Sequence, residues 1–261
     1  MVAENVLGEF LKARRARVPA ARADLPSSTR RRVPGLRRDE LARLAGISEP
    51  YLTRLEQGVD QNPSPQVLRA LARALELDAD TSAYLYSLAD PDPERPADTA
   101  VSEDLHQLLD TWSHTPAYVR NRRFDVLAAN KWARALAPMY EPGHNLARDM
   151  FLDPRTRELF PDWPTIAAQT AAALRAEADP HDPRTAQLIA ELETDADFHT
   201  LWVQHDARPS RDELKRFAHP VVGELAVRRQ ALTVGGSEDQ VIIVYQAAPG
   251  SASEAALARL V

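Results

Sequence analysis

Polar side chains of types that can read DNA bases stand in EPYLTR, the short segment that follows Ser48. Ser48 suits the N-cap of a helix, whose first backbone N–H groups can bind a phosphate. Glu49 can accept a hydrogen bond from a cytosine amino group, Arg54 can pair with guanine, and Thr53 can contact polar base edges or a thymine methyl group. Pro50 can make only apolar contact. We therefore expect base readout from this segment, although Arg54 has a surface ion pair as an alternative role.

Two packed helices are needed to present such a face to a DNA groove. Residues 41–58, LARLAGISEPYLTRLEQG, contain two short apolar-periodic runs that are joined by Gly46 and ended by Gly58. Glycine in the left-handed conformation suits both the tight turn and the helix stop. The residues expected to face inward are Leu41, Leu44, Ala45, Ile47, Leu52 and Leu55. The pattern predicts a helix-turn-helix, although an ordinary buried hairpin of two helices would have the same spacing.

Positive charge is concentrated near the beginning of the chain. Residues 12–38 contain ten Lys and Arg side chains and one acid, Asp24, and residues 1–89 carry a net charge of +3, against −9 for residues 90–261. Such an asymmetry predicts a polyanionic partner for the basic block, or alternatively a solvated arginine-rich loop. We expect phosphate or minor-groove contacts from this block. The candidates are Arg30, Arg31, Arg32, Arg37 and Arg38.

A change of composition divides the chain into two domains. The segment SLADPDPERPADTA at 87–100 contains three prolines and four acids without hydrophobic periodicity. We interpret residues 1–89 as one domain, 90–100 as a linker and 101–261 as a second domain. Hydrophobic periodicity predicts five helices in the first domain, near 3–17, 37–45, 48–57, 64–77 and 80–89.

The second domain mixes helix and strand patterns. Helices are predicted at 101–112, 130–137, 163–178, 182–194 and 195–206. Two short strands are predicted within 117–130, and longer ones at 214–222, 223–234 and 239–248. Strands that flank a central helical insertion predict an α+β fold. The expected fold class is thus an all-α, five-helix N-terminal domain followed by an α+β domain.

Composition and motifs exclude several classes of protein. The chain of 261 residues has no cysteine, which excludes disulfides, Cys-ligated zinc and a cysteine nucleophile. No apolar run approaches the ~20 residues of a membrane span, and the N-terminus lacks the apolar stretch of a signal peptide, so we expect a cytoplasmic protein. His199, His205 and His219 lack the i, i+4 spacing of metal ligands on one helix. We therefore expect no metal, no cofactor and no enzymatic activity.

The helix-turn-helix segment resembles a known family. LARLAGIS, Tyr51–Leu52, RLEQG and NPSPQVLRALARAL are similar to the signature of XRE-family repressors, although Pro50 replaces a residue that is often polar there. The basic, proline-containing insertion before this segment resembles the MmyB-like subgroup. Its C-terminal domain is similar to FDVLAAN (124–130), NLARDMFLDPRTRELFPDW (145–163), LWVQHD (201–206), FAHPVVGEL (217–225) and VIIVYQAAPGSASEAALARL (241–260). The resemblance implies a PAS-like ligand-binding fold, with a fatty-acid-like ligand in at least some members.

Ligand contacts are expected where a few polar groups point into an apolar pocket. Arg148 can pair with the carboxylate of an acidic ligand through two hydrogen bonds. The full set of candidates is Asn130, Arg148, Phe151, Trp202, His205 and His219. For the aromatic residues the alternative is an ordinary core position. For the histidines it is a buried, hydrogen-bonded role in the fold.

These patterns together predict a sequence-specific transcription regulator that binds double-stranded DNA. A single motif of this size reads few base pairs, so a homodimer on a palindrome is expected. A small apolar ligand in the second domain is expected to control DNA affinity. The alternative is a DNA-binding adaptor whose second domain binds a protein partner and whose cavity is filled by its own side chains.

Overall fold

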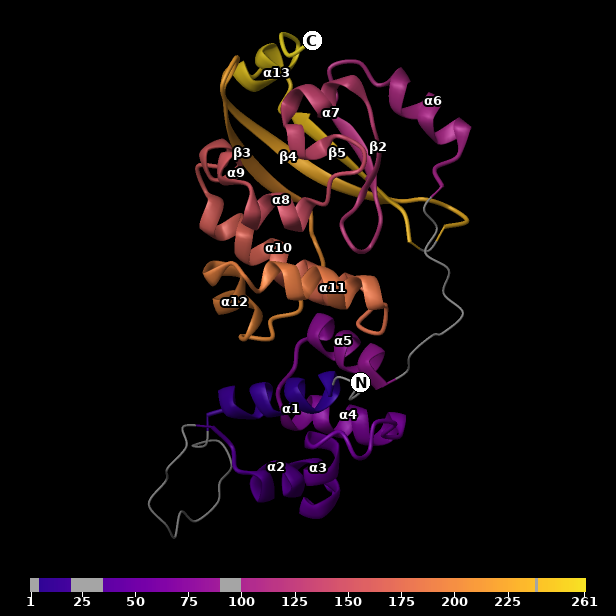
Figure 1. Cartoon of the computed structure of the whole chain (residues 1–261), viewed down its shortest axis with the longest axis vertical. Coiled ribbons are helices and arrows are strands. Elements are labelled where there is room, and N and C mark those ends of the chain that lie inside the picture. The colour runs from indigo at the N-terminus through magenta and orange to yellow at the C-terminus, as the bar shows by residue number, and fades with distance from the viewer. Residues whose placement is uncertain (1–4, 20–34, 90–99, 238) are drawn as a thin grey trace. The chain divides into compact units, whose positions relative to one another are not determined.

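The computed structural model describes residues 5–19, 35–89, 100–237 and 239–261. The chain forms two compact units. The head unit comprises Met1–Pro93 together with Val203–Arg208, and the sheet unit comprises Glu94–Trp202 together with Pro209–Val261 (Figure 1). The division expected from composition, at residues 89 and 101, would have assigned the segment Val203–Arg208 to the second domain.

The head unit contains the five helices that hydrophobic periodicity predicts. They are α1 (Val6–Arg17), α2 (Arg38–Ala45), α3 (Glu49–Glu56), α4 (Pro65–Ala74) and α5 (Ala79–Ala89). Ser48 and Ser64 cap α3 and α4 by accepting hydrogen bonds from backbone N–H groups in the first turn. Pro50 and Pro65 stand in the first turns, where a missing N–H costs nothing.

The core of the head unit is built from apolar stripes on these helices. Its fully buried side chains include Phe10, Leu11, Leu36, Leu41, Leu52, Leu55, Leu71 and Leu85. Two residues expected to face inward differ from this pattern: Leu44 is 49% exposed, and Ile47 is only half-buried. Leu41 and Ala45 are one helical turn apart and share the buried face of α2, which leaves Leu44 on its flank.

The sheet unit is organised around five antiparallel strands in the order β2-β1-β5-β4-β3. The strands are β1 (Ala117–Arg120), β2 (Val126–Ala129), β3 (Glu213–His219), β4 (Gly223–Thr233) and β5 (Val241–Ala247). All five fall where strands were predicted. In the register of the sheet, Arg229 lies between Glu213 on β3 and Tyr245 on β5.

The helices of the sheet unit lie before, between and after the strands in the chain. They are α6 (Glu103–Thr111), α7 (Lys131–Leu136), η2 (Pro138–Tyr140, a 3₁₀ turn), α8 (Leu146–Leu152), α9 (Pro154–Leu159), α10 (Trp163–Glu177), α11 (Pro183–Leu192), α12 (Ala196–Trp202) and α13 (Ala252–Leu257). The predicted helices correspond to α6, α7, α10, α11 and α12. Periodicity did not predict η2, α8, α9 or α13, each of which has seven residues or fewer.

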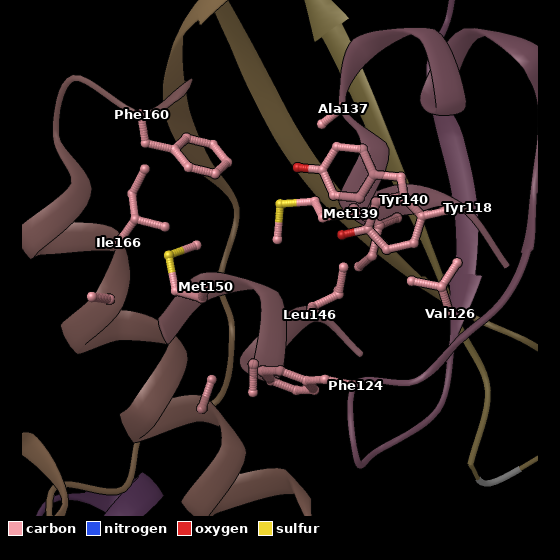
Figure 2. Packing of buried hydrophobic residues seen from close by; sticks show 14 of the residues in the cluster. Tyr118, Phe124, Val126, Ala137, Met139, Tyr140, Leu146, Met150, Phe160 and Ile166 are labelled. Carbon is pink, nitrogen blue, oxygen red and sulfur yellow. The ribbon is translucent and has the colours of Figure 1, made fainter. Parts of the chain in front are cut away.

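Each face of the sheet packs against different helices. On one face, Leu105 and Leu109 of α6 contact Val119, Ile242 and Val244. Alternate residues of the same strands, including Tyr118, Ile243 and Tyr245, point to the other face and enter a much larger core with α7, α8, α10, α11 and α12. Figure 2 shows part of this larger core. The fold class, an all-α unit and an α+β unit, is therefore confirmed.

Candidate DNA interface and ligand cavity

The turn between α2 and α3 fixes the orientation of the candidate reading helix. Gly46 ends α2 in the left-handed conformation, with φ of 67°, and its N–H donates to the Arg43 carbonyl. Ser48 Oγ then accepts from the Tyr51 N–H at 3.3 Å and begins α3. Leu52 and Leu55 on the inner side of α3 are fully buried, and this fixes the rotation of the helix so that its opposite face stays on the surface.

The outer face of α3 is exposed and polar. Glu49, Pro50 and Arg54 are exposed, and Thr53 is half-buried. Thr53 Oγ1 donates to the Glu49 carbonyl at 2.9 Å. Arg54 Nε donates to Asp60 Oδ2 at 2.7 Å, so the ion-pair role weighed for this arginine is present in the free protein. A carboxylate partner does not prevent base contact, which stays a prediction for these four residues.

A buried carboxylate joins the helices behind this face. Glu56, at the end of α3, is 0% exposed and accepts from Arg15 of α1, with 2.7 Å between Arg15 Nε and Glu56 Oε1. Arg38 Nε donates to the other oxygen of Glu56. Arg38 therefore has a structural partner while 44% of its side chain stays exposed. Glu56 therefore joins α1, α2 and α3 through two ion pairs.

The remaining basic candidates are only partly placed. The backbone N–H of Arg37 donates to Glu40 Oε2 at 2.7 Å, directly before α2. Arg30, Arg31 and Arg32 lie outside the described residues. Pro19 and Gly35 pair as an isolated bridge, so the two ends of the basic segment meet beside α1. Phosphate or minor-groove contact by these arginines stays a prediction.

The sheet unit contains a small, partly open cavity between the large-core face of the sheet and the helices. Its volume is about 40 Å³. The strands contribute polar side chains, and the helices contribute mainly apolar ones. The lining residues are Tyr118, Arg120, Phe124, Met139, Tyr140, Leu146, Met150, Phe160, Thr170, Ser210, Lys215, Arg229 and Tyr245. One end of the cavity is thus polar and the other is apolar, as in sites that bind amphiphilic molecules.

Three tyrosines form part of the polar end. The hydroxyl groups of Tyr140 and Tyr245 share a hydrogen bond of 2.9 Å. The ring of Tyr118 stacks on Tyr140 with 4.6 Å between centroids, and Figure 2 shows these two rings close together. Burial raises the pKa of Tyr118 and raises the pKa values of Tyr140 and Tyr245 well above the usual range. These hydroxyl groups are therefore neutral hydrogen-bond donors and acceptors at physiological pH.

Positive charge exceeds negative charge around the polar end. Arg120 pairs with Glu177 at 2.6 Å and Lys215 with Glu213 at 3.3 Å. Arg229 is only 4% exposed, and its side chain donates to a backbone carbonyl, with no salt bridge among the described residues. Three cations and two carboxylates leave an excess of one positive charge when Lys215 is protonated. A buried excess of this kind favours binding of one anionic group.

The pKa values of Lys215 and Arg229, the cations that β3 and β4 contribute to the cavity, shift in opposite directions. Burial lowers the pKa of Lys215 to about 8, Glu213 acts in the opposite direction, and the nearby Arg229 adds to the lowering. Burial also acts to lower the pKa of Arg229, yet the surrounding ionisable groups, Glu177 and Glu213 among them, raise it overall. Arg229 is therefore permanently charged, whereas the charge of Lys215 depends on pH near neutrality.

The six residues expected to bind a ligand have other partners, and none lines this cavity. Asn130 is buried and caps α7, with 2.9 Å from its Oδ1 to the Ala133 N–H. His219 Nε2 lies 3.0 Å from the Ala135 carbonyl, in agreement with the alternative of a structural histidine. Arg148 is exposed and pairs with Glu191 through two hydrogen bonds of 2.7 Å.

The aromatic candidates belong to packed clusters. Phe151 meets Phe198 edge-on at 5.0 Å, within the large core. Trp202 stacks on Phe198 on one side and lies 3.6 Å from the guanidinium carbon of Arg175. His205 belongs to the head unit, where its ring contacts Phe10 with 6.4 Å between centroids. The structure does not bring the six residues together in one site.

Periodicity in β3 and β4 contains a signal for the residues that do line the cavity. Leu225, Val227 and Arg229 occupy successive inward positions on β4, so the third inward residue is an arginine where an apolar residue is usual. Lys215 and Phe217 show the same pattern on β3. A charged residue in the inward register of an otherwise apolar strand points to a buried polar site.

Comparisons with known proteins identify the two parts of the chain. Residues 6–85 match the model of a helix-turn-helix domain. Residues 101–260 match the model of the MmyB-like transcription regulator ligand binding domain. No curated protein matches the chain significantly. Among the described residues, no helix is both long and apolar enough to cross a membrane, and no cluster of His, Asp and Glu suits a metal ion.

Proposed function

Because the chain belongs to the MmyB-like transcription regulators and carries a helix-turn-helix domain before their ligand-binding domain, we propose that it binds a specific DNA sequence under the control of a fatty-acid-like ligand. DNA binding, transcription regulation and the presence of a ligand-binding domain follow from the family, which consists of regulators and not enzymes. The ligand class, the individual DNA contacts and the dimer are our proposal.

The polar end of the cavity supports an anionic ligand. Arg229 is a buried cation that makes no salt bridge among the described residues, and it stands beside the hydroxyl-bearing Tyr118 and Tyr245. A carboxylate there would neutralise the excess charge and accept hydrogen bonds. Met139, Met150 and their apolar neighbours at the other end suit an aliphatic chain rather than a sugar or nucleotide.

The exposed face of α3 supports DNA readout. Its side chains are held by a buried inner face and by the Glu56 ion pairs, so the reading face is preorganised. Phosphate contacts provide most of the affinity and base contacts the sequence preference. Because one such helix reads few base pairs, we propose a two-fold dimer on a palindromic site. The ligand controls DNA binding by having different affinities for the DNA-competent and DNA-incompetent states.

Binding of a carboxylate to purified full-length protein is the direct test of the ligand class. Decanoate binding is measured by calorimetry for the wild type, Arg229→Met and Arg228→Met. Arg228 is a matched control because it neighbours Arg229 on β4 but is exposed. We expect Arg229→Met to weaken binding at least about tenfold, since charge-assisted hydrogen bonds contribute about 1.5–3 kcal/mol, and Arg228→Met to leave it unchanged.

The protein-partner alternative predicts a different result. A wild-type protein that binds no carboxylate, and whose native mass spectrum retains no small acid, would favour an adaptor whose cavity its own side chains fill. Selection from random DNA duplexes tests the other half of the proposal. Recovery of no preferred sequence at low ionic strength would contradict sequence-specific DNA binding.

A further inference from the structure

A surface groove of the sheet unit lies next to the cavity. Its volume is about 280 Å³, against about 40 Å³ for the cavity. It runs between η2, α9 and the end of β3. The residues that line it are Pro138, Met139, Asp153, Arg155, Thr156, Glu158, Leu159, Ala218 and Pro220. Asp153 and Arg155 pair with each other, which leaves the apolar residues as the main surface available to a ligand.

The volumes show that the cavity cannot hold a whole amphiphilic ligand. A cavity of about 40 Å³ has room for roughly one or two water molecules, whereas pockets for small molecules have about 300–1,000 Å³. An anionic group bound beside Arg229 would therefore fill the space, and an attached chain must extend elsewhere. The large core around the cavity is closely packed, so the nearest available space decides where the chain goes.

Met139 is the wall that the cavity and the groove share. It lines both spaces and is 6% exposed. Figure 2 shows it between Phe160 and Tyr140, two further residues of the cavity lining. Leu159, which directly precedes Phe160 in the chain, lines the groove, whereas Phe160 lines the cavity. Methionine is unbranched and flexible, and a rotation of its side chain would join the two spaces at a small energetic cost.

We propose that the groove between η2, α9 and β3 receives the apolar chain of the ligand, which passes Met139 while its anionic group is held beside Arg229. This inference rests on the proposed function, because it assigns the second half of the same ligand. The groove then makes the protein selective for acids with long chains. A short acid has few methylene groups to place in the groove, whereas a long acid buries many more of them there.

A tryptophan on the outer face of β3 tests the groove without altering the cavity. Ala218 is exposed and lines the groove but not the cavity, so Ala218→Trp fills the groove from its side. Leu214→Trp is the matched control, because Leu214 lies on the same outward face of β3, is 64% exposed and lines neither space. Calorimetry with hexanoate and hexadecanoate then gives the affinity of a short and a long acid for each protein.

We expect hexadecanoate to bind the wild type at least about tenfold more tightly than hexanoate, and Ala218→Trp to remove most of that difference. Leu214→Trp should bind both acids as the wild type does, and thermal unfolding identifies any variant that fails to fold. If Ala218→Trp weakened the affinity for both acids by the same factor, or left both affinities unchanged, the groove assignment would be overturned. Absence of binding by either acid to the wild type would instead contradict the proposed function.

The association rate of the acids tests the role of Met139. Met139→Ala removes the shared wall, so hexadecanoate should associate at least about threefold faster, because no side chain has to move before its chain enters. The association rate of hexanoate should change by a smaller factor. Equal rates for the variant and the wild type with hexadecanoate would show that the chain does not pass this residue.

Discussion

At the scale of single residues, Arg54 has two competing anionic partners. Asp60 binds it in the free protein, and DNA must replace this ion pair by a base or a phosphate. Exposed ion pairs are worth about 0–1 kcal/mol, less than a bidentate contact with guanine at about 1–3 kcal/mol. Asp60 therefore orients the guanidinium without preventing its transfer to DNA.

Sequence selection from random duplexes distinguishes these roles. We expect Arg54→Ala to lose the preference at one base position and to weaken binding of the preferred sequence by about 1–3 kcal/mol. Asp60→Asn should strengthen binding to all sequences, because it removes a competing negative charge. Arg69→Ala on α4 is the control for loss of an exposed arginine. An unchanged preference in Arg54→Ala would remove this residue from base readout.

Lys215 makes ligand binding depend on pH. Its pKa of about 8 lies below the ordinary lysine value, and a bound anion favours the protonated amine. The affinity for the acid should therefore be highest below pH 8 and should fall as pH rises through that value. The fall is about tenfold if the bound anion raises the lysine pKa by about one unit. The other charged or titratable groups that face this site are Glu177, Glu213, Arg120, Arg229, Tyr118, Tyr140 and Tyr245.

Calorimetry across this pH range checks the prediction with decanoate. Lys215→Met should bind the acid more weakly at pH 7 and should lose the dependence on pH between about pH 7 and pH 9.5. The tyrosines do not contribute in this range because burial keeps their pKa values high. A dependence that persists in Lys215→Met would assign the titration to another group.

At the scale of helices, Glu56 determines how α1, α2 and α3 fit together. Glu56→Gln leaves Arg15 partly buried without its counter-charge, and Arg38 loses the same partner. We expect a loss of about 1.5–3 kcal/mol in the free energy of unfolding of the head unit, the contribution of a hydrogen bond to a charged group, because both arginines keep contact with water. Thermal or denaturant unfolding measures it, with Glu49→Gln, an exposed substitution on the same helix, as the control. A loss equal to that of the control would mean that the ion pairs contribute little.

Most helices and all strands follow from local sequence signals. Glycine at 46, serine caps and prolines in first turns predict the head helices, because these residues act on backbone geometry near them. The turn caps that begin α8 and α9, Asn145 and Asp153, also have local signatures. Helices of six or seven residues make barely two turns, so periodicity is a weak signal for them, and it predicted α7 and α12 but not α8 and α9.

The candidate site depends on longer-range information. Arg148 and His219 have the residue types of a ligand site, and yet each has a nearby partner in the fold, Glu191 and the Ala135 carbonyl. Which charged residues surround a cavity depends on strand register between β1, β3, β4 and β5, segments that lie far apart in the sequence. The inward placement of Arg229 could be predicted from alternation along β4, whereas its proximity to Tyr118 could not.

At the scale of the whole molecule, the segment Val203–Arg208 completes the head unit. Asp206 pairs with Arg14 at 3.3 Å and Arg17 at 2.8 Å, and Ala207 is fully buried. Thr81 on α5 donates to the Ala207 carbonyl. The head is therefore stabilised by residues that are encoded more than a hundred positions after its last helix.

A charge at position 207 tests this dependence in the intact protein. We expect Ala207→Glu to destabilise the head unit by several kcal/mol, because an unpaired charge would be placed in a buried position. Hydrogen exchange should accelerate in α1 and α5. Val203→Glu is the control, since Val203 in the same segment is 52% exposed. Exchange rates that stay equal to those of the control would show that this segment is dispensable for the head.

The return of the chain to the head makes it a discontinuous domain in the topological sense. A truncated chain that ends at residue 93 would omit one of its own pieces, and the polypeptide passes between the units at three peptide bonds rather than one. A modular exchange of sensors by simple fusion would therefore leave the DNA-binding part incomplete. A functional chimera would have to contain residues 203–208 together with the five helices, either within the same chain or as a separate peptide.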